Sequence, residues 1–318
     1  MTALLRLVEE FLRQLKALIY GWIEIVLTTR NWWSVLVVYS GIRSTTNVVF
    51  RKGATIRFSR QTRAFYIALR KLVLCGVTPV NESDKLLLVQ LPSGIRLLIR
   101  HIHGDLVTVR EVFLDRAYYL PDLEGKVVVD VGAGIGDSSI YFAQSGAEVY
   151  AFEPLLESYK LARRNIELNG LADKIHLYNR AVSGSHGFIT LRTVVGEPER
   201  STTSSFDAGF VDAGSVETIT LGEIIDQNGL NRIDVLKLDC EGCEFEVIRP
   251  ENEQALALVH RILIEYHRDP RTICIFLRRM GFATTMKKMT SHLRAREGPI
   301  RPDQGWIYAE RTEVPVIV

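Results

Sequence analysis

The chain has 318 residues, of which 47% are hydrophobic and 24% charged, and its formal net charge is +2. This apolar fraction is ordinary for a globular protein and excludes a disordered chain, while 23 glycines and 10 prolines exclude a collagen-like one. At roughly one to two hundred residues per domain, the length predicts one large domain or two ordinary ones.

The four cysteines are too few for a disulfide framework, and they predict a reducing, cytoplasmic environment. Two of them, Cys240 and Cys243, form a single CxxC pair. A structural zinc site of this kind needs a second pair of ligands, so we predict no structural metal.

The basic residues are concentrated in the N-terminal part. Residues 1–70 contain 11 Lys and Arg and three Glu, a balance of +8. Of the 39 basic and 37 acidic residues in the chain, this leaves 28 and 34 for the rest, a balance of −6. The asymmetry favours an anionic partner for the N-terminal part, although a solvated helix face would produce the same pattern.

Two apolar stretches, residues 17–29 and 32–40, follow a start that lacks the basic region of a signal peptide. Glu24, Arg30 and Asn31 interrupt them, and neither reaches the roughly 20 apolar residues of a membrane-spanning helix. Three interpretations stay open: a buried helix of a small N-terminal domain, a helix at a membrane surface with tryptophans at headgroup depth, or a partner-docking helix. We therefore expect a cytoplasmic protein, with peripheral membrane contact as the alternative.

Residues 1–120 predict a small α+β domain, because short strand-like runs with glycine turns are mixed with helical spacing. The expected elements, in chain order, are a helix at 4–29, a hairpin at 47–59, a helix at 60–74, a hairpin at 84–100 and a strand at 106–113.

Residues 121–318 predict a different architecture, in which strands and helices alternate. The first strand, 127–131, is entirely apolar except for Asp130, as expected for a strand covered on both faces. Such alternation indicates a doubly wound α/β domain with a mostly parallel sheet. The further expected strands are 148–152, 174–182, 232–239, 261–267, 283–288 and 306–310, with an inserted hairpin between 187 and 221.

The strongest motif follows the first of these strands, where Gly132, Gly134 and Gly136 form a GxGxG turn before a helix. Glycine allows a tight turn and a close ligand, and a helix N-terminus offers unpaired N–H groups. The dinucleotide fingerprint would need its third glycine at 137, where Asp137 stands and would repel a pyrophosphate. The pattern therefore favours a ligand with an amino-acid end. Glu153, directly after the second strand, can accept hydrogen bonds from a ribose.

Four segments of this domain match a known pattern: DVGAGIGDSSIYFA from residue 130, VYAFEP from 149, LKLDCEGCEFEVI from 236 and LIEYH from 263. Together they resemble class I S-adenosylmethionine-dependent methyltransferases, and more narrowly the FkbM family, over roughly residues 105–310. The resemblance implies a Rossmann-like seven-stranded methyltransferase sheet and S-adenosyl-L-methionine as the cofactor. Cys240 and Cys243 stand where the family has variable residues, so no thiol role is implied.

The resemblance also implies positions for the cofactor. All of them lie at carboxyl ends of strands, where open α/β sheets bind their ligands. The implied cofactor-binding residues are Gly132, Gly134 and Gly136 around the methionine end, Asp130 at its amine, Glu153 on the ribose, Asn179 and Ala181 near the adenine, and Asp239 beside the methyl group.

A hydroxyl acceptor must lose its proton, which a nearby carboxylate or histidine can accept. The candidate catalytic residues are Asp239, Glu241 and His267. Two alternatives stay open: Glu241 could cap the following helix, and these residues could hold a divalent cation together with Glu265.

We predict a methyltransferase that O-methylates a saccharide, a glycolipid or a small molecule. One alternative is an RNA methyltransferase, favoured by C-terminal basic residues but lacking base-clamping and Pro-Cys motifs after the fourth strand. Another is a non-catalytic protein that retains the fold. The C-terminal basic residues that favour the RNA methyltransferase alternative are Arg278, Arg279, Lys287, Lys288, Arg294, Arg296 and Arg301.

Overall fold

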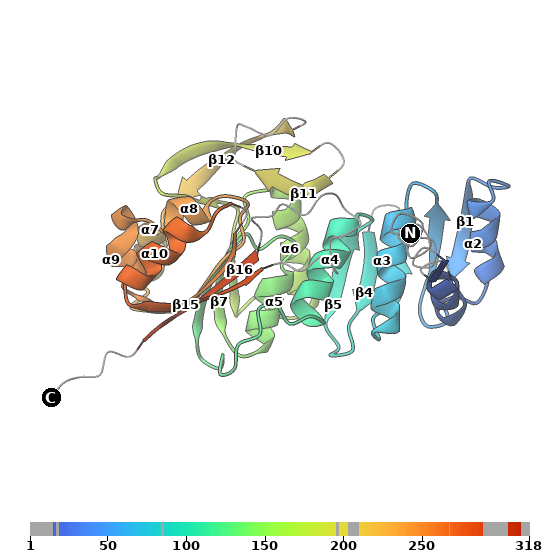
Figure 1. Ribbon diagram of the computed structural model, residues 1–318, viewed down its shortest axis with the longest axis horizontal. Helices are drawn as coiled ribbons and strands as arrows, with labels where there is room; N and C mark the ends of the chain where they lie inside the picture. Colours follow the sequence, from blue (N-terminus) through green and yellow to red (C-terminus); the bar gives the residue numbers. More distant parts are fainter. Residues whose placement is uncertain are drawn as a thin grey trace, which may run out of the picture. The chain divides into compact units, whose positions relative to one another are not determined.

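The computed structural model describes residues 15–16, 19–83, 86–194, 197–202, 210–266, 268–288 and 305–312. The chain divides into two compact units, Met1–Asp115 and Arg116–Val318. The positions of the two units relative to each other are not determined, so each is described by itself (Figure 1).

The first unit contains helices and two small antiparallel sheets. Strands β1 and β2 pair as one hairpin and β3, β4 and β5 form the other sheet, so the hairpins predicted at 47–59 and 84–100 are confirmed. Its elements after the helical residues 19–28 are α2 (Trp32–Tyr39), β1 (Thr45–Val49), β2 (Thr55–Ser59), α3 (Arg63–Leu74), β3 (Thr78–Glu82), β4 (Leu86–Gln90), β5 (Arg96–Arg100) and α4 (His103–Phe113).

The strand predicted at 106–113 is wrong, because these residues form most of helix α4. Several β-branched residues in this segment favoured a strand. The buried side chains are Leu106, Val109 and Val112, which are three residues apart and so share one face of a helix. The helix is fixed at its start by buried Asp105, whose carboxylate accepts hydrogen bonds from the backbone and side chain of Arg100.

The second unit is built on a seven-stranded sheet, here called the main sheet. Its strand order is β15-β16-β14-β13-β6-β7-β8, and β16 alone runs antiparallel to both neighbours. This confirms the predicted doubly wound α/β fold with a seven-stranded sheet. The strands are β6 (Val127–Val131), β7 (Glu148–Phe152), β8 (Ile175–Tyr178), β13 (Ile233–Leu238), β14 (Val259–Tyr266), β15 (Phe282–Lys288) and β16 (Gly305–Arg311).

Helices cover both faces of the main sheet. In Figure 1, α5 and α6 lie on one side of it and the later helices on the other. The core on the second side includes buried apolar residues of strands and later helices, such as Leu236, Ile264, Ile224 and Leu277. The helices are α5 (Asp137–Gln144), α6 (Leu156–Leu168), α7 (Leu221–Asn228), α8 (Glu244–Val247), α9 (Glu253–Leu256) and α10 (Arg271–Arg279).

The third predicted strand, 174–182, is divided between two sheets. Its first part is β8, and its end, β9 (Ala181–Val182), pairs instead with β12 (Phe210–Ile219) in a second sheet. The second sheet has the order β11-β10-β12-β9, with β10 (Gly187–Val194) and β11 (Glu197–Thr202), so the predicted inserted hairpin carries one more strand.

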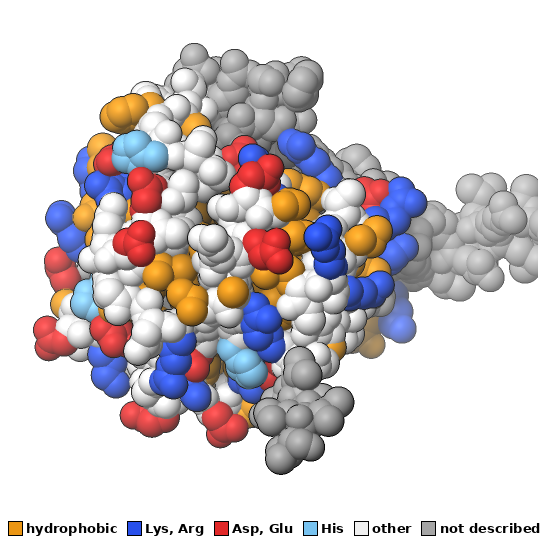
Figure 2. Space-filling model, turned by 90° about the vertical axis from the view of Figure 1, so that its left-hand side faces the viewer, with side chains coloured by type: hydrophobic (Ala, Val, Ile, Leu, Met, Phe, Trp, Pro, Cys, Tyr) orange, Lys and Arg blue, Asp and Glu red, His pale blue; other side chains and the backbone are white. Residues whose placement is uncertain are grey.

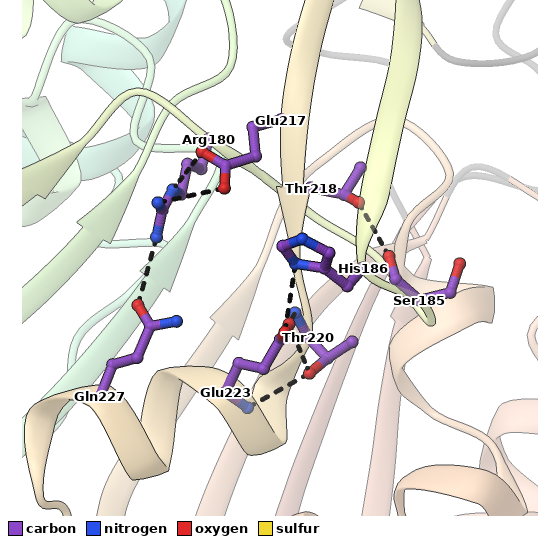
Figure 3. A network of polar contacts seen from close by, with 8 residues as sticks. All are labelled: Arg180, Ser185, His186, Glu217, Thr218, Thr220, Glu223 and Gln227. Carbon is purple, nitrogen blue, oxygen red and sulfur yellow. Dashed lines mark hydrogen bonds and ion pairs between the residues drawn. The ribbon is translucent and has the colours of Figure 1, made fainter.

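Polar contacts attach the second sheet to helix α7 (Figure 3). Arg180 donates to Glu217 of β12 at 2.9 and 3.2 Å and to Gln227 of α7 at 3.2 Å. His186 Nδ1 lies 3.1 Å from Glu223 Oε1. Glu223 also closes a capping box at the start of α7, in which its carboxylate accepts the Thr220 N–H at 2.8 Å and its own N–H reaches the Thr220 hydroxyl.

Removing the Thr220 side chain and protonating Glu223 should each weaken this cap. We expect Thr220→Ala to reduce the free energy of unfolding by about 1 kcal/mol, while Thr220→Ser keeps the cap. The Thr220 backbone N–H contributes most to holding the pKa of Glu223 below its ordinary value of 4.5. The stabilisation by Glu223 is therefore complete above that value and lost as the pH falls through the lower folded-state value. Urea denaturation at neutral and acidic pH measures both effects; a Thr220→Ala stability equal to wild type at neutral pH would contradict the prediction.

Candidate active site

The glycine turn between β6 and α5 packs tightly on one side and leaves room on the other. All three glycines have positive φ, at 78, 55 and 86° for Gly132, Gly134 and Gly136. A Cβ on Gly132 would come within 1.8 Å of the Asp239 carbonyl oxygen, and one on Gly136 within 3.2 Å of Ala162 Cα. A Cβ on Gly134 would meet nothing closer than Asp137 Oδ1 at 3.8 Å. A Cβ on Gly134 would thus point into open space.

Glu153 lies at the end of β7 against this turn and is 5% exposed. Its carboxylate accepts the Gly134 N–H at 2.8 Å through one oxygen and the Leu155 N–H at 2.8 Å through the other. The side-chain amide of Asn179 donates to the carbonyl oxygens of Glu153 and Pro154, both at 2.9 Å. The structure therefore brings Gly134, Glu153 and Asn179 together. Ala181 is buried in the core of the second sheet and packs with Leu155.

Asp130 is completely buried beneath the glycine turn. Its Oδ2 accepts hydrogen bonds from the hydroxyls of Ser138 and Ser139 at 2.7 and 2.6 Å. Its Oδ1 lies 2.9 Å from Lys237 Nζ. These contacts tie β6 to α5 and β13, and the expected contact of Asp130 with the methionine amine stays a prediction.

Lys237 is a functional candidate to which the sequence analysis assigned no role, although it belongs to the family pattern. It is buried in β13, where its ammonium donates to the Gly132 carbonyl at 2.8 Å and lies 4.0 Å from Asp239 Oδ2. Burial lowers the pKa of Lys237, but the charges of Asp130 and Asp239 outweigh burial and leave the pKa above its usual value. The signal was a lysine in the apolar second half of β13, because a buried cation needs buried anions.

Asp239 ends β13 beside the turn, where its N–H bonds to the Val131 carbonyl at 3.1 Å. Its side chain is 28% exposed, in contrast to the buried Asp130 and Glu153. The hydroxyl of buried Tyr118 donates to Asp239 Oδ2 at 2.9 Å, and the Tyr118 ring packs edge-on against Trp306. Asp239 is thus a partly exposed carboxylate held in place by neighbouring side chains.

The residues after Asp239 form a closed loop. Cys240 and Cys243 are joined by a disulfide, which corrects the expectation of reduced cysteines. Glu241 is half-buried and has a φ of 54°. Buried Glu244 accepts the Gly242 N–H at 2.8 Å. His267, the third catalytic candidate, lies outside the described residues.

The alternative in which Asp239, Glu241, Glu265 and His267 hold a divalent cation is not supported by the part of the chain that the structure describes. No three His, Cys, Asp or Glu side chains lie close enough together there to hold a metal ion. Glu265 is buried in β14 opposite Trp306. Of the C-terminal basic residues, Arg278, Arg279, Lys287 and Lys288 are exposed, and the other three lie outside the described residues. On the left of the face in Figure 2 basic and acidic side chains are interspersed, and towards its right-hand edge basic side chains predominate.

Comparison with known families gives a match over the segment that contains these residues. The model of the methyltransferase FkbM domain matches residues 130–294, just over half of the chain. The chain belongs to the FkbM methyltransferase family. The predicted family, methyltransferase activity and S-adenosylmethionine cofactor are therefore confirmed, and the matched segment begins at Asp130 and contains both the glycine turn and the loop after β13.

Curated relatives are similar over much of the chain. The 31-O-demethyl-FK506 methyltransferase FkbM of Streptomyces tacrolimicus is 25% identical over 58% of this chain and 83% of its own length. The hexuronic acid methyltransferase AglP of Haloferax volcanii is 24% identical over 60% and 75%. The AMB antimetabolite synthetase AmbE of Pseudomonas aeruginosa is 26% identical over 68% of this chain, which spans only 12% of AmbE.

A solved structure with bound S-adenosylmethionine, the magnesium protoporphyrin IX methyltransferase of Synechocystis, is 17% identical with a TM-score of 0.35, over 64% of this chain and 78% of that one.

Among the described residues, none of the helices is long and apolar enough to cross a bilayer.

Proposed function

We propose that this methyltransferase acts on a hydroxyl group of a saccharide, glycolipid or small molecule, and that Asp239 accepts the hydroxyl proton. The observation that carries the proposal is the partly exposed Asp239 carboxylate beside the glycine turn, held by Tyr118 at 2.9 Å. Two relatives support the acceptor class, since one is named for a 31-O-demethyl substrate and the other for hexuronic acid.

The open space at Gly134 and the acidic residues around it suit the cofactor. S-adenosylmethionine supplies an electrophilic methyl group on a sulfonium ion, and acidic side chains favour that positive charge. Gly134 would leave room for the methionine end, and Glu153 would accept hydrogen bonds from the ribose hydroxyls. Asn179 would hold Glu153 and Pro154 in position through their carbonyl oxygens.

The proton would leave the acceptor hydroxyl through Asp239. Its Oδ2 already accepts from Tyr118 and lies 4.0 Å from the Lys237 ammonium, so the carboxylate has a defined orientation before the acceptor arrives. Holding the hydroxyl in line with the methyl group would supply much of the rate. Glu241 and His267 remain the further candidates for the base.

Calorimetry with S-adenosylmethionine and S-adenosylhomocysteine tests the cofactor site. We expect micromolar binding by the wild type and a loss of more than about tenfold in Gly134→Val, because the added side chain would fill the open space. Gly170→Val is a matched control, since Gly170 also has a positive φ and open space but follows α6 away from the turn. Equal binding by wild type and Gly134→Val, or no binding by folded wild type, would contradict the proposal.

We also propose that the first unit binds the surface of an anionic membrane. Helical residues 19–28 turn an apolar face to solvent, whereas a surface helix ordinarily exposes its polar face. The buried Ile25 and Thr28 lie on the opposite side. The exposed apolar side chains are Ile19, Tyr20, Ile23, Val26 and Leu27 of this helix and Trp32, Trp33 and Leu36 of α2; we call them the apolar face.

Cations flank the apolar face at the end of the first helix. Arg51 Nε donates to the Val26 carbonyl at 3.0 Å, and Arg30 donates to the Arg51 carbonyl at 3.3 Å. Both guanidinium groups are on exposed residues. Exposed tryptophan and aliphatic side chains beside cations match the headgroup region of an anionic bilayer. This supports a peripheral contact that would bring the enzyme to lipid-linked saccharides.

Flotation with liposomes tests this contact. We expect the wild type to float with anionic vesicles and less with neutral ones. Ile23→Ser/Trp33→Ser should lose most of the binding, because each serine removes apolar area that the bilayer would otherwise bury. Ile275→Ser is the matched control, because Ile275 is an exposed apolar residue of α10 in the second unit. Failure of the wild type to float would refute the contact, and a dimer that Ile23→Ser/Trp33→Ser dissociates would assign the apolar face to a second copy instead.

A further inference from the structure

The loop that follows β13 contains a disulfide that has no chemical role in the proposed methyl transfer. It joins Cys240 to Cys243 across Glu241 and Gly242. Cys240 is half-buried and Cys243 is 7% exposed, so an external thiol would reach Cys240 more easily. The cysteines at 75 and 274 are free thiols.

The closed ring holds an uncommon backbone conformation. Glu241 has a φ of 54° and Gly242 a φ of 132°. Residues other than glycine rarely adopt the left-handed region, because their Cβ approaches a carbonyl oxygen. The disulfide limits the ring to four residues, and an open ring would allow Glu241 to return to the ordinary helical or extended region.

The ring begins where the cofactor turn and the proposed base meet. Asp239 directly precedes Cys240, and its carbonyl oxygen lies so close to Gly132 that a Cβ there would come within 1.8 Å. Such a Cβ would also lie 3.5 Å from Cys240 Cα. A rotation of the Asp239–Cys240 peptide would therefore displace the glycine turn and the Asp239 side chain together.

We propose that the Cys240–Cys243 disulfide is a redox modification site for dithiol reductants, and that its closure holds the glycine turn and Asp239 in their binding geometry. This inference rests on the proposed function, because its effect is on the cofactor and the base of that site. The reduced enzyme keeps its fold but binds the cofactor more weakly and transfers methyl more slowly.

Reduction proceeds by thiol–disulfide exchange. A thiolate of the dithiol attacks Cys240 Sγ and forms a mixed disulfide, and Cys243 leaves as a thiolate that takes up a proton. The second thiol of the reductant then attacks the mixed disulfide and releases Cys240, so two electrons and two protons reach the protein and the dithiol becomes a disulfide. Glu244 Oε2, 3.7 Å from Cys240 Sγ, lies within reach of the thiol that forms.

The experiment uses the full chain purified without reductant. Alkylation with iodoacetamide before reduction and N-ethylmaleimide after it, read by peptide mass spectrometry, reports whether the disulfide is closed. Calorimetry with S-adenosylmethionine is then run before and after dithiothreitol. We expect the dissociation constant to rise about three- to tenfold on reduction and to recover on reoxidation. Circular dichroism should be unchanged, because the main sheet does not depend on the disulfide.

Two variants separate this disulfide from the other thiols. Cys240→Ser/Cys243→Ser should bind S-adenosylmethionine as weakly as the reduced wild type, and dithiothreitol should not change its affinity. The affinity of Cys75→Ser/Cys274→Ala should fall on reduction as that of the wild type does. Free thiols at 240 and 243 in the protein as purified, or equal affinities of the oxidised and reduced wild type, would overturn the proposal while the proposed function stands. Absence of binding in both states would instead refute the proposed function and this inference with it.

Discussion

Asp239→Asn should abolish most of the methyl transfer while leaving the cofactor bound. Asparagine keeps the shape of the side chain and an oxygen that can accept the Tyr118 hydroxyl, but it cannot take a proton from the acceptor. Loss of a positioned general base lowers kcat by about 10²- to 10⁴-fold. We expect the dissociation constant for S-adenosylmethionine to change by less than about tenfold, so single-turnover kinetics and calorimetry together measure the two effects.

A matched control for this experiment is Asp226→Asn, which alters an exposed aspartate of α7 and should leave the rate unchanged. An Asp239→Asn rate within about threefold of wild type would show that Asp239 is not the base, and Glu241→Gln would then be the next variant to compare.

Lys237→Met should produce a large loss of stability. The substitution removes a buried cation that lies 2.9 Å from the completely buried Asp130, and leaves that carboxylate without its counter-charge. Removing one partner of a buried ion pair costs about 3–5 kcal/mol. Urea denaturation measures the free energy of unfolding, and Lys160→Met, which changes an exposed lysine of α6, should cost less than about 1 kcal/mol.

The double variant Lys237→Met/Asp130→Asn distinguishes a charge effect from a packing effect. Neutralising Asp130 as well should recover part of the stability, because no unpaired charge then remains buried. The pKa of Lys237 is raised, so its contribution in the wild type is complete below the ordinary value of 10.5 and is lost as the pH rises through the higher folded-state value. A loss below about 1 kcal/mol in Lys237→Met would contradict the geometry of the buried pair.

The sequence analysis identified the main sheet and the glycine turn from local pattern. The apolar run at 127–131 and the glycines after it predict a buried strand and a tight turn, and the structure has both. That the turn binds a ligand stays a prediction. Glu153 was found in the same way, because an acidic residue at the end of the next parallel strand must lie near that turn. Whether Glu153 binds a ribose stays a prediction.

Prediction from local sequence pattern was wrong where contacts between residues distant in the chain decided the secondary structure. The β-branched residues of 106–113 favoured a strand, yet their burial on one face made a helix. The strand predicted at 174–182 breaks because Asn179 bonds back to Glu153 and Pro154, and β9 then finds its partner in β12, which is remote in sequence.

By itself the sequence determined the α/β class, the family and the position of the glycine turn, since strand period, glycine spacing and strand-end carboxylates are local properties. Only the tertiary structure decided that Lys237 links Asp130 to Asp239, that Tyr118 orients Asp239 and that Cys240 and Cys243 close a ring beside the turn. The physical reason is that burial and charge pairing depend on which strands become neighbours, and β13 lies next to β6 although about 100 residues separate them in the chain.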